Sequence, residues 1–518
     1  MTLTAPIAAD RLPPPREAVR AAIDELSRSV EGRLSSEEQD RLCYARDMWP
    51  KALVWIRQGR IPPPPDVVVW PRSEEEVGQV IRVARAHRIP VIPFGAGSGV
   101  CGGVYAVSGG IALDLKKLER VDKVDVERRA VQAQAGVIGE VLERALNAQG
   151  FTLGHFPSSI YMSTLGGWLA TRSAGQFSSL YGKIEDMVLS VRAVLGTGEV
   201  VVTPERPRRG PDLAQLLIGS EGTLCAFTSA TLRVHPLPEH RAFRGIRFRS
   251  VSDGVEAIRR LFRAGLRPAV VRLYDPFDTA LVGRGHRHQD GVTPPSLRGW
   301  WEAEVVPVVS RIAAPRTLGR PSLLNRAAAL FQHCLLILVF EGETRRTVKE
   351  AEAGRAICLR AGGEDEGEGP GRDWFEKRYA VSYKMSKVVD RGALADTMEV
   401  AGTWDRVMEI YERVRAAVRP FAFVLCHFSH AYPEGCSLYF TFVLSAPDRE
   451  QERRYDELWR VALQAAMSAG ATVSHHHGVG LLKARELAEE LGEGRRMLVA
   501  LKRAFDPDGI LNPGKLTL

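Results

Sequence analysis

The sequence predicts an α+β protein in which two mixed blocks of strands and helices follow one another. Short apolar strands alternate with amphipathic helices between Asp66 and Pro236, and a second such series runs from residue 239 to 470. The prolines Pro62–Pro65 set the first block apart from a helical stretch before it. We therefore expect four parts: a helical N-terminal segment over residues 1–60, an α+β domain over 61–238, a second α+β domain over 239–470, and a C-terminal histidine loop and helix over 471–518 that return to the first α+β domain.

Hydrophobic periodicity and capping signals place the elements of the first block. Ser73 followed by Glu76 forms a capping box and predicts a helix over Glu74–His87. A Gly-Thr-Gly turn after Leu195 predicts a hairpin. The remaining strands and helix, in chain order, are expected at Val67–Trp70, Val91–Phe94, Ile111–Leu115, Ala130–Ala135, the helix Val137–Asn147, and the hairpin strands Val188–Leu195 and Glu199–Thr203.

The second block contains apolar strands and one long helix. Residues Gly283–Arg320, rich in Arg, Pro and Gly, show no clear period. After this block, Glu486–Phe505 predicts a single helix that ends in a turn-rich stretch. The strands are expected at Val270–Leu273, Leu335–Phe340, Phe421–Cys426 and Leu438–Leu444, and the helix at Glu452–Ala469.

Composition excludes several classes of protein. The net charge of +8 is mild for 518 residues, so it favours anionic small molecules or lipid headgroups and does not indicate a nucleic-acid partner. The seven cysteines include no Cys-x-x-Cys pair, which indicates free thiols in a reducing compartment. The longest apolar run, Cys334–Phe340, is far shorter than the roughly 20 residues of a membrane span. We expect a cytoplasmic location, with any membrane contact peripheral.

A glycine loop follows the predicted strand Val91–Phe94. Gly97–Gly102 matches G-x-G-x-x-G, but a dinucleotide-binding motif of the Rossmann type requires a helix next, and here another strand follows. Closely spaced glycines still allow backbone N–H groups to approach a pyrophosphate without side-chain clashes. The alternative is a plain glycine-rich loop. Below, Gly95–Gly103 is called the glycine loop.

Two further stretches favour a large nucleotide cofactor. Pro157–Gly175 contains Gly166 and Gly167, each of which weakens a helix by about 1 kcal/mol. Either a flat ring must approach this backbone, or the helix packs closely on a sheet. Gly219–Leu224 again offers turn residues and backbone donors before a strand. Three such stretches within one domain indicate a cofactor with phosphates and a ring.

These motifs resemble the FAD-binding oxidoreductases of the vanillyl-alcohol-oxidase, or PCMH-type, fold. The resemblance rests on Val91–Gly99, Ser163–Trp168, Leu180–Val188, Gly219–Leu224 and Asp506–Gly514. It implies a PCMH-type FAD-binding domain of two α+β subdomains, an α+β cap domain for the substrate, and FAD held non-covalently, since the glycine loop has no histidine. The residues it assigns to the cofactor are Pro93, Gly95, Ala96, Gly97, Ser98, Gly99, Pro157, Ser163, Thr164, Gly166, Gly167, Ser173, Ala174, Gly175, Glu221, Gly222, Phe227 and Asn512.

Within that fold the sequence is similar to the alkyldihydroxyacetonephosphate synthases from about Arg41 to Leu518. The resemblance implies that flavin N5 displaces the fatty acid of acyl-dihydroxyacetonephosphate and that a long-chain alcohol then adds, giving an ether lipid precursor without net redox change. This lipid substrate also implies a peripheral contact with the inner face of the cell membrane, for which Gly283–Arg320 is the candidate. Separately, we expect a homodimer. The segments that carry it are Pro157–Gly175, Ala269–Asp275, Leu338–Gly342, Cys436–Phe442 and Ser474–Gly480.

The candidate catalytic residues lie late in the chain. His475, His476 and His477 are consecutive, and an imidazole can move protons near neutral pH. By strand alternation Tyr439 shares a face with Thr441, and a phenol can act as acid or base if its pKa is lowered. The resemblance assigns to Tyr439 and the histidines the proton transfer at substrate carbon 1. The alternatives are a histidine-rich surface turn and a packing role for the tyrosine.

Two cations are candidate substrate ligands. Arg272 interrupts an apolar strand, so its guanidinium needs an anionic partner, either a ligand or Asp275. The resemblance places the matching arginine in the active site. Where the family has a second functional arginine this chain has Met385, so we expect Lys384, or alternatively Lys387, to supply the charge as a point charge without a bidentate fork.

Three alternatives remain open at this stage. Cys426, His427 and His430 have a spacing that suits zinc, although no paired cysteines or carboxylates accompany them, and we expect no metal. An FAD-linked oxidase or dehydrogenase of a D-2-hydroxy acid or alcohol is the alternative activity on the same scaffold. A flavoprotein without enzymatic activity is the third.

Overall fold

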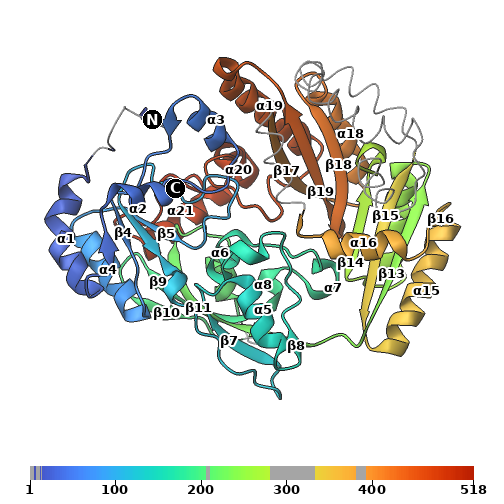
Figure 1. The fold of residues 1–518 in the computed structure, drawn as a ribbon, viewed down its shortest axis with the longest axis horizontal. Coiled ribbons are helices and arrows are strands. Elements are labelled where there is room, and N and C mark those ends of the chain that lie inside the picture. Colours follow the sequence, from blue (N-terminus) through green and yellow to red (C-terminus); the bar gives the residue numbers. More distant parts are fainter. Residues whose placement is uncertain (1–4, 7–11, 13, 206–209, 280–332, 381–392) are drawn as a thin grey trace, which may run out of the picture. The chain divides into compact units, whose positions relative to one another are not determined.

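The computed structural model describes residues 5–6, 12, 14–205, 210–279, 333–380 and 393–518 (Figure 1). They form two compact units. The first unit comprises Met1–Gly175, Tyr181–Leu237 and Val473–Leu518, and the second comprises Gln176–Leu180 and Pro238–Thr472. Each unit combines helices with sheets, which confirms the predicted α+β class.

The first sheet of the first unit is partly parallel. Its two outer neighbours β4 and β5 both pair in parallel with the central β6, and the short β2 pairs antiparallel with β4. In sheet order the strands are β2 (Leu34–Ser35), β4 (Val67–Val69), β6 (Ile111–Asp114) and β5 (Val91–Phe94).

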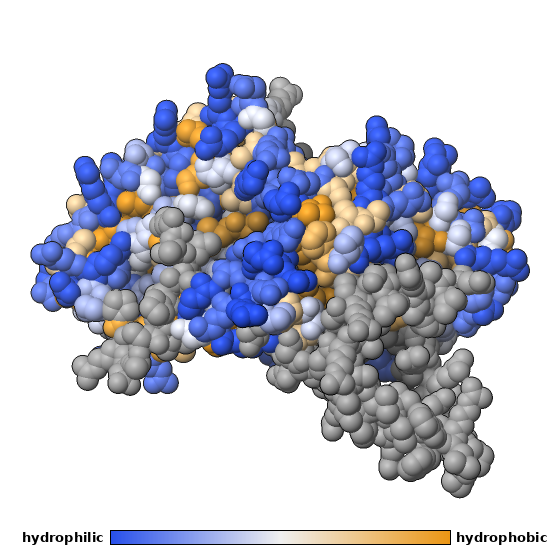
Figure 2. Space-filling model, turned by 90° about the horizontal axis from the view of Figure 1, so that it is seen from above, coloured by the Kyte–Doolittle hydropathy of each residue, from blue (hydrophilic) through white to orange (hydrophobic). Residues whose placement is uncertain are grey.

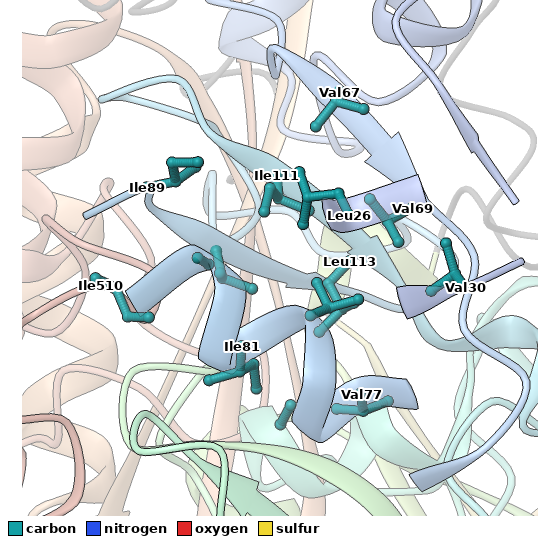
Figure 3. Close-up of a cluster of buried hydrophobic side chains, with 14 of the residues drawn as sticks. Leu26, Val30, Val67, Val69, Val77, Ile81, Ile89, Ile111, Leu113 and Ile510 are labelled. Atoms are coloured by element: carbon teal, nitrogen blue, oxygen red, sulfur yellow. The ribbon is translucent and has the colours of Figure 1, made fainter. Parts of the chain in front are cut away.

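The core beside this sheet joins distant parts of the chain (Figure 3). Helix α1 (Glu17–Ser29) contributes Leu26, helix α4 (Glu74–Ala86) contributes Ile81, and Ile510 comes from near the C-terminus. The N-terminal helix is therefore built into the core of the first unit. Two shorter helices, α2 (Glu38–Cys43) and α3 (Lys51–Arg57), and the short strands β1 (Ala5–Pro6) and β3 (Arg60–Ile61) complete this region.

The start of α4 follows the predicted capping signal with one change. Ser73 Oγ accepts a hydrogen bond from the N–H of Glu76 at 3.2 Å. The Glu76 carboxylate accepts from the N–H of Arg72 at 2.6 Å. In a capping box the carboxylate would accept from the N–H of the N-cap residue Ser73, whereas here it accepts from the N–H of the residue before it. The N–H groups of Arg72 and Glu76 are thus both hydrogen-bonded at the start of the helix.

The second sheet of the first unit is antiparallel and includes the predicted hairpin. Helix α6 (Leu165–Thr171) packs against β11 and β7. In sheet order the strands are β10 (Val200–Val202), β9 (Val188–Leu195), β11 (Cys225–Arg233) and β7 (Ala130–Gln134). The remaining elements are α5 (Gly139–Asn147), α8 (Ile184–Met187), α9 (Leu213–Leu217), the paired β8 (Phe151–Thr152) and β12 (His235–Pro236), and the 3-10 turns η1 (Leu115–Lys117) and η2 (Ile160–Met162).

The C-terminal tail contains two helices where the sequence predicted one. Helix α20 (Ala484–Leu491) ends at Gly492, which has φ 50° and ψ −124°, and α21 (Gly494–Phe505) begins two residues later. This backbone conformation is open essentially to glycine alone and cannot continue a helix. Beyond α21, Leu511 forms a parallel bridge with Val91 and so extends the first sheet.

The second unit is built on a seven-stranded antiparallel sheet. Four strands were predicted, and three, β13, β16 and β17, were not. In sheet order the strands are β16 (Glu364–Asp365), β13 (His240–Phe248), β15 (Cys334–Gly342), β14 (Val270–Tyr274), β18 (Phe423–Ala431), β19 (Gly435–Leu444) and β17 (Leu394–Thr403).

Helices pack on one face along most of this sheet. Gly254 of α10 (Val251–Arg263) meets Leu273, and the ring of Tyr411 in α18 (Val407–Val418) packs on Phe428. Two further helices, α15 (Thr344–Arg360) and α19 (Asp448–Ser468), cover the same face, whereas α16 (Gly369–Lys377) packs on the opposite face at β13. The short α7 (Ser178–Tyr181) completes the elements.

No helix among the described residues is long and apolar enough to cross a membrane. Figure 2 shows a face on which hydrophilic side chains cover most of the described surface, with smaller apolar areas between them.

Candidate functional site

The glycine loop of the first unit presents a run of backbone donors. The N–H groups of Ala96, Gly97, Ser98 and Gly99 donate no hydrogen bond to any of the described residues. Gly97 has φ 65°, and a Cβ there would lie 2.9 Å from the ring of Phe94. Successive N–H groups around a left-handed residue form an anion-binding concavity. The loop therefore fits the phosphates of a nucleotide cofactor.

The far end of the glycine loop is fixed by Asp47, which the sequence analysis missed. Asp47 Oδ2 accepts from the N–H groups of Gly102 and Gly103 at 2.9 and 3.1 Å, and its Oδ1 accepts from Trp49 N–H at 3.0 Å. Burial raises the pKa of Asp47 to about 7. The bond from Trp49 N–H to Asp47 Oδ1 forms an Asx turn, which many surface aspartates also form.

The segment Ser163–Gly167 lies directly against the glycine loop. Thr164 caps α6, because its Oγ1 accepts from Gly167 N–H at 3.2 Å, and a Cβ on Gly95 would lie 2.4 Å from the same Oγ1. A Cβ on Gly166 would meet Ala135 at 3.0 Å. Helix–sheet packing therefore accounts for Gly166, and the close contact of two segments accounts for Gly95.

His155 is a second residue that the sequence analysis missed. It is fully buried beside α6, with its ring 4.5 Å from that of Trp168, and neither ring nitrogen has a partner among the described residues. Burial lowers the pKa of His155 to about 3, so the imidazole is neutral. Its backbone approaches Gly175, where a Cβ would lie 2.4 Å from the Phe156 nitrogen.

The side chains of Glu221 and Asn512 bond to the protein. The carboxylate of Glu221 accepts from Val479 and Gly480 N–H, at 2.5 and 2.8 Å. Asn512 Nδ2 donates to the carbonyls of Gly103 and Glu221 at 2.9 and 2.6 Å. Through these bonds, the two side chains connect the glycine loop with the turn at Glu221 and with residues 479 and 480. The other predicted cofactor residues, all in the first unit, are Pro93, Pro157, Ser173, Ala174, Gly222 and Phe227.

The three histidines also belong to the first unit, in a closed turn, Ser474–Gly480, called the histidine loop below. Ser474 Oγ donates to the Gly478 carbonyl at 3.0 Å, which closes the turn. The Nδ1 atoms of His475 and His476 are 3.0 Å apart, and the ring planes of His475 and His476, and of His476 and His477, are inclined by 80° and 72°. Neighbouring imidazole planes are therefore nearly perpendicular, and all three rings are partly exposed.

Tyr439 lies in the second unit, stacked on a histidine. Its ring is 4.7 Å from that of His427 with an interplanar angle of 18°, and its hydroxyl donates to Thr397 Oγ1 at 3.0 Å. Phe440 and Phe442 face the core, as strand alternation predicted. Burial raises the pKa of Tyr439 to about 12, opposite to the lowered pKa that the sequence analysis required.

Arg272 lies beside the same histidine. Its Nη2 is 3.4 Å from His427 Nδ1, and its guanidinium is 5.2 Å from the ring centroid of Tyr274. Its buried Nε has no partner among the described residues. The carboxylate of Asp275 pairs instead with Arg415 at 2.5 Å. Within the described part of the chain, the Arg272 guanidinium therefore has one unsatisfied donor.

The charges around His427 indicate a neutral ring. Burial and the neighbouring Arg272 hold the pKa of His427 well below its usual value. Burial raises the pKa of Asp278 to about 6, although Arg272 opposes this shift. The 3.5 Å approach of Asp278 Oδ2 to His427 Nδ1 is therefore not an ion pair at neutral pH.

The remaining predictions concern other parts of the chain. Lys384, Met385, Lys387 and Gly283–Arg320 lie outside the described residues. Among the residues the structure describes, no three histidine, cysteine or acidic side chains gather as metal ligands. Of the three residues whose spacing suits zinc, His430 has its Nδ1 2.8 Å from Ser178 Oγ, and Cys426 and His427 occupy successive strand positions whose side chains point to opposite faces of the sheet.

Family models match most of the chain. Residues 65–204 match the FAD binding domain, and residues 237–516 match the C-terminal domain of the FAD linked oxidases. Together with the glycine loop, these matches define the class: an FAD-dependent enzyme. They also confirm FAD as the cofactor and the predicted PCMH-type fold.

Individual relatives narrow this class. Alkyldihydroxyacetonephosphate synthase of Trypanosoma brucei brucei is 30% identical, over 99% of this chain and 83% of the relative. An uncharacterized FAD-linked oxidoreductase of Escherichia coli K12 is 31% identical, over 88% of this chain and 89% of the relative. A solved structure of an alkyldihydroxyacetonephosphate synthase has a TM-score of 0.78 and 26% identity, covering 99% of this chain and 88% of that one. The chain belongs to the family of FAD-binding proteins that contains the alkyldihydroxyacetonephosphate synthases.

Proposed function

We propose that this enzyme exchanges the acyl group of acyl-dihydroxyacetonephosphate for a long-chain alcohol, a step of ether lipid synthesis. The observation that carries the proposal is the similarity to a synthase over 99% of the chain. The exchange breaks the bond between carbon 1 and the acyl oxygen and forms one between carbon 1 and the alcohol oxygen. A fatty acid leaves, the alcohol gives up a proton, and no electrons pass to an acceptor.

The first unit would hold FAD without a covalent bond. The N–H groups of Ala96–Gly99 are available for the pyrophosphate, and the glycine loop contains no histidine that could form a flavin linkage. The thiol of Cys101, in the same loop, donates to the Gly478 carbonyl at 3.5 Å. Bound FAD would supply, at its N5 atom, the nucleophile for the displacement at carbon 1.

The proton transfers would fall to Tyr439 and the histidine loop. With a pKa of about 12, Tyr439 keeps its proton at neutral pH and so acts as a hydrogen-bond or proton donor. One of His475–His477 would accept the proton of the incoming alcohol. Arg272, whose Nε has no partner among the described residues, would bind the substrate phosphate, with Lys384 as the proposed second cation.

Three expectations from the sequence remain proposals. The second unit would serve as the substrate-binding cap. The enzyme would be cytoplasmic and contact the inner face of the membrane peripherally to reach its lipid substrates. It would also form a homodimer, which sedimentation of the purified protein would test directly.

The direct test is an exchange assay with purified holoprotein. Labelled hexadecanol and acyl-dihydroxyacetonephosphate should yield labelled alkyl-dihydroxyacetonephosphate and one fatty acid per ether formed. The flavin should show the absorbance of the oxidised form again once the substrates are consumed, without addition of an electron acceptor. Failure of the label to enter the phosphate product would refute the proposal.

A redox activity is the second candidate, favoured by the FAD linked oxidase domain and by the bacterial FAD-linked oxidoreductase relative. Such an enzyme would oxidise a D-2-hydroxy acid or an alcohol and reduce its flavin. Anaerobic mixing with D-lactate or glycolate distinguishes the two candidates, because an oxidoreductase would bleach near 450 nm, the usual flavin band, and a synthase would stay yellow.

A further inference from the structure

Glu221 lies in a strained turn with its carboxylate buried. Gly219, Glu221 and Gly222 have φ values of 85°, 47° and 74°, and only the middle residue carries a side chain. A left-handed conformation is unfavourable for glutamate, and such strain persists where the surrounding structure requires it. What this turn achieves is to direct the Glu221 carboxylate at two successive N–H groups of the histidine loop.

The carboxylate is matched to that task. Oε1 accepts from Val479 N–H at 2.5 Å, and Oε2 accepts from Gly480 N–H at 2.8 Å. A carboxylate has two acceptor oxygens, whereas the amide of glutamine has one and would turn an NH₂ group toward the second N–H. Burial raises the pKa of Glu221, whereas the N–H groups of Val479 and Gly480 and the two buried lysines Lys483 and Lys515 oppose this shift and favour the ionised carboxylate.

The other contacts of the histidine loop reach the same surroundings. Lys483 Nζ donates to Ser474 Oγ at 3.2 Å, which fixes the start of the loop. The carbonyl of Cys101, in the glycine loop, accepts from Leu481 N–H at 2.9 Å. The histidine loop is thus fastened at both ends, and one fastening belongs to the loop that would bind the pyrophosphate.

We propose that Glu221 is a positioning residue that sets the histidine loop for proton transfer, and that its carboxylate does not bind FAD. The inference rests on the proposed function, because it assumes that His475–His477 serve the exchange. It reassigns a residue that the sequence placed among the cofactor ligands. Only the backbone of Glu221 would then face the cofactor.

The test compares E221Q with D506N in the holoprotein. Asp506 is a matched control, since its buried carboxylate also accepts from two backbone N–H groups, those of Ile510 and Leu511, at 3.1 and 2.8 Å. The measurements are bound FAD per chain, hydrogen exchange at the amides of residues 479 and 480, and kcat and KM of the acyl-for-alcohol reaction.

For E221Q we expect full FAD content and amide exchange at 479 and 480 faster by at least about tenfold. We also expect kcat to fall by at least about tenfold with KM within about threefold, because positioning for the chemical step is lost and substrate binding is not. D506N should lower the melting temperature but leave the amides at 479 and 480 and the turnover per flavin unchanged.

Two results would overturn the inference. Loss of FAD from E221Q with unchanged turnover per remaining flavin would identify a cofactor ligand. Unchanged amide hydrogen exchange at residues 479 and 480 would show that the Glu221 carboxylate does not hold the histidine loop. If the unsubstituted protein lacks synthase activity, the proposed function fails, while the exchange measurement still reports on the hold of Glu221.

Discussion

At the scale of single residues, Tyr439 shows how burial restricts a functional group. Its stacking on His427 and its bond to Thr397 fix the ring, and its high pKa leaves it a donor. Tyr439→Phe should therefore retain bound FAD but reduce kcat by about 10²-fold or more, the size of a general-acid contribution. Flavin absorbance and the exchange assay measure the two effects.

Thr441→Ala is the control for Tyr439→Phe, because Thr441 lies on the same strand face two residues further on. It should change kcat by less than about threefold, since the bond from the Tyr439 hydroxyl is accepted by Thr397 and the Tyr439 ring stacks on His427, and Thr441 supplies neither contact. His476→Ala should resemble Tyr439→Phe, with FAD retained and turnover suppressed. Loss of the yellow colour in either variant would indicate a structural role instead.

His155 makes the stability of the chain sensitive to acid. Its pKa is about 3 in the folded chain and near 6.5 when unfolded, so its contribution is complete above pH 6.5 and is lost as the pH falls toward 3. At pH 5 the loss amounts to about 2 kcal/mol. His155→Leu should abolish this part of the pH dependence, as measured by urea unfolding of the apoprotein between pH 7 and 5. Equal slopes in the two proteins would contradict the assignment.

Asp47 and His155 also show what a sequence cannot reveal at this scale. An Asx turn is a common surface feature, and nothing in the chain near Asp47 indicates that its second oxygen meets Gly102 and Gly103, more than fifty residues away. The glycines themselves were predictable, because their close spacing is visible in the sequence and allows backbone N–H groups to approach an anion. Their individual reasons differ: Gly166 serves packing, whereas Gly97 requires a positive φ.

At the scale of elements, the missed strands break the apolar pattern for identifiable reasons. Strand β13 carries Arg241, Arg244 and Arg247, each paired with a glutamate, so it does not resemble a buried strand in the sequence. Strand β17 points Asp396 into the core, where Tyr455 and Trp459 donate to it at 2.5 and 3.0 Å. In the sequence, a lone aspartate argues against a buried strand, because a buried carboxylate needs hydrogen-bond partners. Here those partners come from a helix far along the chain, so the pattern around Asp396 does not reveal them.

The break between α20 and α21 provides a test of element boundaries. Gly492→Ala places a side chain at φ 50° and ψ −124° and should lower the free energy of unfolding by about 1–2 kcal/mol. Gly494→Ala, at the first position of α21 with open space around it, should be neutral or raise that free energy by about 0.5 kcal/mol. Denaturant unfolding of both variants measures the difference, and equal effects would mean that Gly492 carries no strain.

At the scale of the whole molecule, the order of the chain differs from the order of the units. The first unit takes residues from both ends of the sequence, and the second is inserted between them. The sequence predicted the two blocks correctly as α+β, since local periodicity marks them. The return of residues 471–518 to the first domain was also predicted, and Val473–Leu518 belong to the first unit. Local periodicity alone does not show this return, because the contact between Val91 and Leu511 spans most of the chain.

This arrangement predicts how fragments behave. A fragment of residues 1–237 lacks Ile510 from its core, Leu511 from its sheet, and the Asn512 side chain that joins Gly103 to Glu221. The fragment should therefore fail to bind FAD. Joining residues 473–518 to it through a flexible linker of about 15 residues should restore a yellow protein that folds cooperatively. We expect this because the strand contact, the core residue and the Asn512 hydrogen bonds return together. The same linked fragment with Asn512→Ala is the control, and it should hold FAD more weakly. Flavin fluorescence quenching and circular dichroism measure the outcome, and a fragment of 1–237 that binds FAD as tightly as the linked form would show that the C-terminal residues are dispensable for the cofactor site.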